Sequence, residues 1–171
     1  AEASSNLARY DGVRYGSRHV DKNTDLMDFY CQNRSNGFGW EVKKRIMLGS
    51  FVLSAGYFDA YFTHAQKVRE KLRRDTELIF NNYDYILLPN SPSTAFSLGE
   101  KKIDPIAMYL ADIFTVYSNL TGVPSVSIPL FWHNNGLPFG VQIMTRKLEE
   151  LPLLRLTRYW TNKYSTSHKR N

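Results

Sequence analysis

The sequence lacks the residues that would support an extracellular disulfide framework or a membrane span. It contains one cysteine, Cys31, which excludes an internal disulfide and points to a reducing compartment. The longest apolar stretch, residues 46–62, is interrupted by Ser50, Ser54 and Asp59. It is too short and too polar to cross a bilayer. We therefore expect no membrane association and interpret this stretch as a buried helix.

Several common catalytic motifs are also absent. No serine lies in a Gly-x-Ser-x-Gly elbow, and no glycine-rich loop could cradle a phosphate or a dinucleotide. No histidine is paired with a second ligand at the spacing that metal sites use. The sequence therefore predicts no metal site and no complete catalytic group. The histidines are His19, His64, His133 and His168.

The composition is that of a folded domain. The 171 residues are 43% hydrophobic and 22% charged, which predicts a single domain with its own core. The first residue is Ala1 and no signal peptide pattern follows, so we expect a segment cut from a longer chain. The net charge is +6, concentrated in residues 67–74 and in the tail around 168–170. A solvated helix face explains this charge, and contact with an RNA-bearing partner is the alternative.

Hydrophobic periodicity and turn residues predict alternating helices and strands. Residues 1–16 are polar and are expected to be irregular, with a turn at Asp11-Gly12. A tight loop is expected at 33–39, where two glycines occur, and a hairpin turn at 134–138. Apolar runs predict strands at 83–88, 125–130 and 139–144. Helices are predicted at 25–33, from 40 to about 81 with a break near 54–56, at 104–119 with Asp104 as N-cap, and at 148–164.

This alternation predicts an α/β sandwich whose sheet is covered on both faces. Three strands are few for such a sheet, so at least one edge would lie bare. We therefore expect the chain to self-associate.

Several segments are far more specific together than any one of them. They are residues 4–16 (SSNLARYDGVRYG), 37–39 (GFG), 41–49 (EVKKRIMLG), 53–61 (LSAGYFDAY), 65–69 (AQKVR), 104–115 (DPIAMYLADIFT) and 137–142 (LPFGVQ). Together these segments resemble the amidase-signature family. The resemblance covers almost the whole chain and is strongest to the carboxy-terminal third of the A subunits of glutamyl-tRNA(Gln) amidotransferase. It implies the carboxy-terminal part of an α/β/α sandwich with a mixed sheet.

The resemblance also implies an activity and a set of partners. Members of the family hydrolyse amides with a Ser–cis-Ser–Lys triad that precedes the matched region, so this segment is expected to be inactive alone. The A subunit hydrolyses glutamine, and the ammonia converts Glu-tRNA(Gln) to Gln-tRNA(Gln) on the B subunit. ATP, magnesium and tRNA bind the B subunit, the C subunit braces the pair, and no cofactor is expected in this chain. The expected location is the cytoplasm, or an organellar matrix in a eukaryote.

Two residues match the family's glutamine pocket. Arg45 is expected to bind the α-carboxylate with its planar fork, and Asp112 the α-ammonium group. From the residues alone, Arg45 could equally form a helix ion pair with Glu41, and Asp112 could be a capping or surface residue.

The sequence departs from the family pattern at a few positions, including Asn36, Tyr117 and residues 128–131. Two other interpretations remain open: a different amide hydrolase of the family, or a non-catalytic interaction module with this fold.

Overall fold

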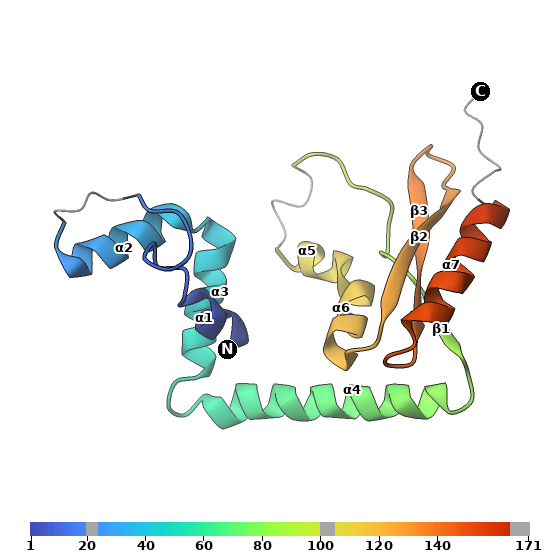
Figure 1. Cartoon of the computed structure of the whole chain (residues 1–171), viewed down its shortest axis with the longest axis horizontal. Helices are drawn as coiled ribbons and strands as arrows, with labels where there is room; N and C mark the ends of the chain where they lie inside the picture. Colours follow the sequence, from blue (N-terminus) through green and yellow to red (C-terminus); the bar gives the residue numbers. More distant parts are fainter. Residues whose placement is uncertain (20–23, 100–104, 165–171) are drawn as a thin grey trace. The chain divides into compact units, whose positions relative to one another are not determined.

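A computed structural model describes residues 1–19, 24–99 and 105–164 (Figure 1). Its contacts group the chain into two compact units, Ala1–Lys67 and Val68–Asn171, where the sequence predicts one domain. The predicted N-cap Asp104 and the basic tail lie outside the described residues. Within those residues, no helix combines the length and apolar character that a bilayer crossing needs.

Unit 1 is helical. Asp25 caps the second helix, because its carboxylate accepts a hydrogen bond of 3.1 Å from the backbone N–H of Met27. This helix continues to Gly37, so the loop expected at 33–39 shrinks to Phe38 and Gly39. The break predicted near 54–56 is confirmed, since residues 53–57 form a non-helical turn between the third helix and a π-helical segment that leads directly into the fourth. The elements are α1 (Glu2–Leu7), α2 (Leu26–Gly37), α3 (Trp40–Val52), η1 (Phe58–Thr63) and the start of α4 (His64–Phe80).

The expectation that residues 1–16 are irregular is wrong for α1. This short helix packs on α3 at Gly49, where an added Cβ would lie 2.6 Å from the Cβ of Ser4. The hydroxyls of Ser4 and Ser50 are 3.3 Å apart across the same contact. Tertiary packing therefore makes this polar segment helical, which local sequence does not reveal.

The segment after α1 turns at Asp11-Gly12, as predicted. Asp11 accepts hydrogen bonds from the backbone N–H groups of Val13 (2.8 Å) and Arg14, which hold the pKa of its carboxyl below the usual range. Gly12 has φ +80°, which favours glycine. The buried Asn33 of α2 then accepts a 2.7 Å hydrogen bond from the N–H of His19. The Asn33 side chain of α2 thus holds the end of this loop at His19.

The expected burial of residues 46–62 is wrong in unit 1. Met47 is 70% exposed, Leu48 57% and Tyr61 53%. Among the described residues α3 packs mainly on α1 and η1, and these cover only its Gly49 side. Phe51, Tyr57 and Tyr61 instead stack on one another, with the first two ring centroids 4.4 Å apart.

Unit 2 contains a three-stranded sheet in the order β1-β3-β2 (Figure 1). The strands are β1 (Tyr85–Pro89), β2 (Ser125–Trp132) and β3 (Pro138–Thr145). All three predicted strands and the hairpin are confirmed. Both pairings within the described residues are antiparallel, where a mixed sheet was expected. The short hairpin makes β2 and β3 antiparallel. β1 pairs with the other edge of β3 and is also antiparallel to it.

Helices cover both faces of this sheet, as expected for a sandwich. Ile128 and Ile143 face α7 (Glu150–Tyr164), where Leu153 completes the buried core. Gln142, next to Ile143 in β3, points to the opposite face and contacts α6 (Ile113–Thr121). Figure 1 shows α6 and α7 on opposite sides of the strands.

Most of α4, from Val68 onwards, belongs to unit 2 and is held there by specific polar contacts. The Thr76 and Tyr117 hydroxyls are 2.6 Å apart, linking α4 to α6, and Arg146 Nη2 donates to the Phe80 carbonyl at 2.6 Å. Most of the basic run lies in ion pairs between exposed side chains of the helix, as expected for a solvated helix face. Arg73 and Arg74 hold the pKa of Glu70 below its usual range. The pairs are Lys71–Asp75, Arg73–Glu70, Arg73–Glu77 and Arg74–Glu70.

Gly140 allows a hydrogen bond to cross the sheet surface. The Asn90 side-chain amide donates to the Ser127 hydroxyl beside Gly140. An added Cβ at Gly140 would lie 2.7 Å from Asn90 Nδ2 and would press on the Ile128 carbonyl oxygen. The absence of a side chain at Gly140 therefore keeps β1 and β2 connected over β3.

We predict that Gly140→Ala lowers the free energy of unfolding by about 1–3 kcal/mol, because backbone and amide must shift. Urea unfolding followed by circular dichroism measures this. The control is Gly37→Ala, whose added methyl would meet only His19 at 4.0 Å and should change stability by less than about 0.5 kcal/mol. Equal stability of the two variants would contradict the role of Gly140.

Candidate functional site

Asp112 lies at a break between two helices, where the sequence predicts one continuous helix. α5 (Pro105–Ala111) ends before it and α6 begins after it, and Asp112 has φ −99° and ψ 5°. It occupies the N-cap position, yet its carboxylate makes no capping hydrogen bond. The backbone carbonyl of Asp112 instead accepts from Val116 N–H and the Thr115 hydroxyl, both at 3.1 Å. The side chain of Asp112 is exposed.

A buried polar network fixes α6, and so Asp112, against the sheet. Gln142 is 3% exposed, and its side-chain amide donates to Ser118 of α6 at 3.1 Å and to Ser125 of β2 at 3.3 Å. The hydroxyls of Ser118 and Ser125 are themselves 3.2 Å apart. Buried polar groups of this kind specify one arrangement because breaking them leaves unpaired groups.

Arg45 lies on α3 and forms the ion pair that its spacing predicts. Its Nε is 3.1 Å from Glu41 Oε1, and the arginine side chain is 60% exposed. The hydrogen bond to Glu41 uses Nε, not the two terminal nitrogens. Those nitrogens are still able to bind a carboxylate.

The two expected glutamine ligands lie in different units. Arg45 belongs to unit 1 and Asp112 to unit 2, and each is described in its own unit. The observed geometry fits the alternatives to a ligand role that the sequence alone leaves open. Arg45 forms a helix ion pair, and Asp112 lies exposed at a helix terminus.

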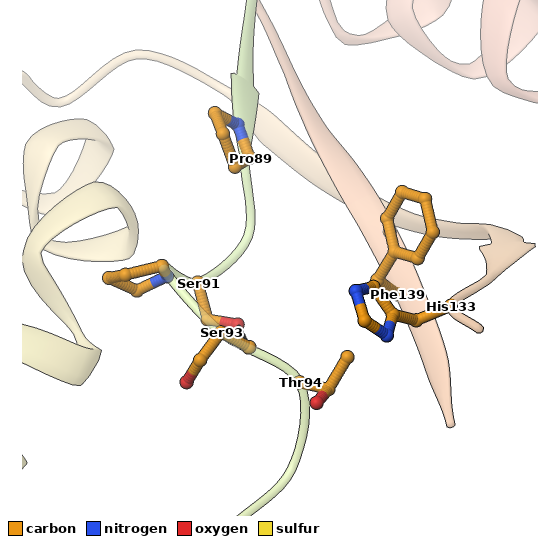
Figure 2. Close-up of a pocket in the computed structure, with 8 residues that line it drawn as sticks. Pro89, Ser91, Ser93, Thr94, His133 and Phe139 are labelled. Carbon is orange, nitrogen blue, oxygen red and sulfur yellow. Dashed lines mark hydrogen bonds between the residues drawn. The ribbon is translucent and has the colours of Figure 1, made fainter. Parts of the chain in front are cut away.

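Unit 2 contains a cavity of about 430 Å³, and Asp112 is not among the residues that line it. Figure 2 shows the loop after β1 on one side, with Ser91, Ser93 and Thr94, and His133 and Phe139 of the hairpin on the other. Asn135 joins the two sides, because its amide donates to the Thr94 hydroxyl at 3.1 Å. The sequence indicates only a Ser/Pro-rich loop and a lone histidine here, so this cavity was missed.

The cavity offers hydroxyls and one imidazole, but most of these groups are already engaged. The Ser91 hydroxyl donates to the Ser93 carbonyl at 2.5 Å, and His133 Nδ1 accepts from the N–H of Asn135 at 3.4 Å. This lining suits a small, neutral, polar molecule. It provides no nucleophile paired with a base.

Four serine hydroxyls elsewhere in the described parts of the chain are also bonded to non-basic groups. Ser4, Ser118 and Ser125 contact other hydroxyls, and Ser127 accepts from an amide. No cluster of three His, Cys, Asp or Glu side chains suited to a metal occurs in the described parts of the chain.

Comparison with known proteins identifies the family. The Amidase family model matches residues 1–154. The A subunit of glutamyl-tRNA(Gln) amidotransferase from Sphingopyxis alaskensis is 54% identical over 90% of this chain and 31% of its own length. Its counterpart from Desulforamulus reducens is 51% identical over 99% of this chain and 34% of its own.

A solved structure of the A subunit from Thermotoga maritima superposes with a TM-score of 0.61 at 42% identity, covering 82% of this chain and 32% of that one. The chain thus spans about a third of the length of these relatives. Because the family model covers most of the sequence, this chain belongs to the amidase family.

Proposed function

We propose that this chain is the carboxy-terminal part of the glutaminase subunit of glutamyl-tRNA(Gln) amidotransferase. In that role the whole subunit hydrolyses glutamine and supplies ammonia for converting Glu-tRNA(Gln) to Gln-tRNA(Gln). The observation that carries the proposal is the 54% identity, over 90% of the chain, to a protein named as that subunit.

Within this proposal Arg45 binds the α-carboxylate of glutamine and Asp112 its α-ammonium group. The structure supports the assignment because neither charge is fully used: Asp112 makes no capping bond, and Arg45 engages Glu41 through Nε alone. Together the two residues select an amide that carries an amino-acid head group.

The same proposal implies the partners. The whole glutaminase subunit would work with the B and C subunits of the amidotransferase in the cytoplasm. ATP, magnesium and tRNA would bind the B subunit, and no step performed by this chain would involve them. The bare outer edges of β1 and β2 would favour self-association of the isolated chain.

We predict that Arg45→Ala or Asp112→Asn, each introduced into the whole subunit within its complex, raises the KM for glutamine about 10- to 100-fold. The reason is that hydrogen bonds to charged groups contribute about 1.5–3 kcal/mol. Steady-state ammonia release measures the effect.

The control is Glu41→Gln, which removes the ion pair with Arg45 but keeps the guanidinium. It should leave KM within about threefold of the parent. A KM that changes equally in Glu41→Gln and Arg45→Ala would show that Arg45 acts only as the partner of Glu41. An unchanged KM in both Arg45→Ala and Asp112→Asn would refute the assignment.

We further predict that the purified 171-residue chain releases no ammonia from glutamine above the buffer rate. The reason is that the triad of this family precedes the matched region, and the hydroxyls of Ser4, Ser91 and Ser127 bond to a hydroxyl, a carbonyl and an amide instead of a base. A coupled glutamate dehydrogenase assay, with the whole subunit as positive control, tests this. Turnover by the isolated chain would contradict it.

A further inference from the structure

A second cavity, in unit 1, carries positive charge, and neither Arg45 nor Asp112 lines it. It has a volume of about 240 Å³ and lies where the end of α2 meets the first half of α3. Two cations and one hydroxyl provide its polar groups, and three apolar side chains form the rest. The lining residues are Arg34, Ser35, Phe38, Lys43, Ile46 and Met47.

Neutral groups hold Arg34 in place without cancelling its charge. Its Nη1 donates to the Leu7 carbonyl at 3.1 Å, and its guanidinium lies 5.1 Å from the centroid of the Phe38 ring. Lys43 is half-buried. Among the described residues no carboxylate forms an ion pair with Arg34 or Lys43, and nearby Glu41 is taken by Arg45.

The cavity and Arg45 use roughly opposite sides of α3. Lys43, Ile46 and Met47 follow the i, i+3, i+4 spacing and therefore share one face of the helix. Residues turn by about 100° each, which directs Glu41 and Arg45 away from that face. The side chain that is proposed to bind glutamine is thus separate from this cavity.

The lining identifies the ligand chemistry. Two cations that have no carboxylate partner within the described ranges favour an anionic ligand. Phe38, Ile46 and the 70% exposed Met47 favour an apolar group beside that anion. The volume is below that of a typical metabolite pocket, so one or two side chains fill it. Stacking of an RNA base is disfavoured, since Arg34 covers a face of the only aromatic ring in the lining.

We propose that this cavity binds an acidic segment of a partner protein, in which a carboxylate side chain is flanked by an apolar one. The carboxylate lies between Arg34 and Lys43, and the apolar side chain packs on Ile46 and Met47. The site is independent of glutamine binding and of the chemistry of amide cleavage.

The test titrates the ¹⁵N-labelled chain with three probes and follows the backbone amides of residues 34–47 by NMR. The probes are a blocked leucine–glutamate–leucine tripeptide, its leucine–glutamine–leucine counterpart, and adenosine monophosphate. We expect saturable shifts with the glutamate peptide and at least about fivefold weaker binding of the glutamine peptide, because only the former is charged.

Lys43→Gln should weaken binding of the glutamate peptide about fivefold or more, and Lys43→Arg should restore it. The matched control is Lys44→Gln, at an exposed position of the same helix outside the cavity, which should bind as the parent does. Equal binding of the two peptides, equal effects of the Lys43 and Lys44 variants, or tighter binding of adenosine monophosphate would overturn the proposal. So would amide shifts showing that residues 34–47 are not helical, since the cavity needs both helices.

Discussion

β3 hydrogen-bonds to a strand on each side, and its last four residues, Gln142–Thr145, are all buried. This double pairing decides where the rest of unit 2 lies. Ile143 directs the apolar face towards α7, and Gln142 directs a polar group towards α6. The position of Asp112 depends on β3 indirectly. α6 begins immediately after Asp112, and the hydrogen bond between Gln142 and Ser118 holds α6 to the sheet.

Unit 1 depends on a different constraint, the close approach of α1 to α3 at Gly49. That contact leaves the remaining sides of α3 with distinct chemistry. One side carries the Glu41–Arg45 ion pair, and another carries Lys43 beside the apolar side chains of Ile46 and Met47. A single helix thereby presents both a proposed substrate ligand and a separate positively charged cavity.

The sequence predicts the elements whose cause is local. The three strands and the hairpin follow from apolar runs and turn residues. The Arg45–Glu41 pair follows from i, i+4 spacing. Other features depend on contacts between distant segments: α1 forms because Gly49 admits Ser4, and Met47 is exposed because no described element covers it.

The candidate site divides in the same way. Arg45 and Asp112 are identified from matched segments, but the helix break at Asp112 is not predicted, since apolar periodicity runs through residues 105–121. The cavity between Thr94 and His133 requires the hairpin and a loop some 40 residues earlier to meet, and no local pattern encodes that. Gln142 carries no functional signal in sequence either, because its importance comes from burial beside Ser118.

The central claim is that Arg45 binds the α-carboxylate of glutamine and Asp112 binds its α-ammonium group. Substrates that lack one of these groups test the claim most directly. Ammonia release by the whole glutaminase subunit would be compared for glutamine, for 4-aminobutanamide, which lacks the α-carboxylate, and for glutaramate, which lacks the α-amine. The account predicts that Arg45→Ala lowers kcat/KM for glutamine but not for 4-aminobutanamide, and that Asp112→Asn lowers it for glutamine but not for glutaramate. Equal losses on all three substrates would contradict the claim.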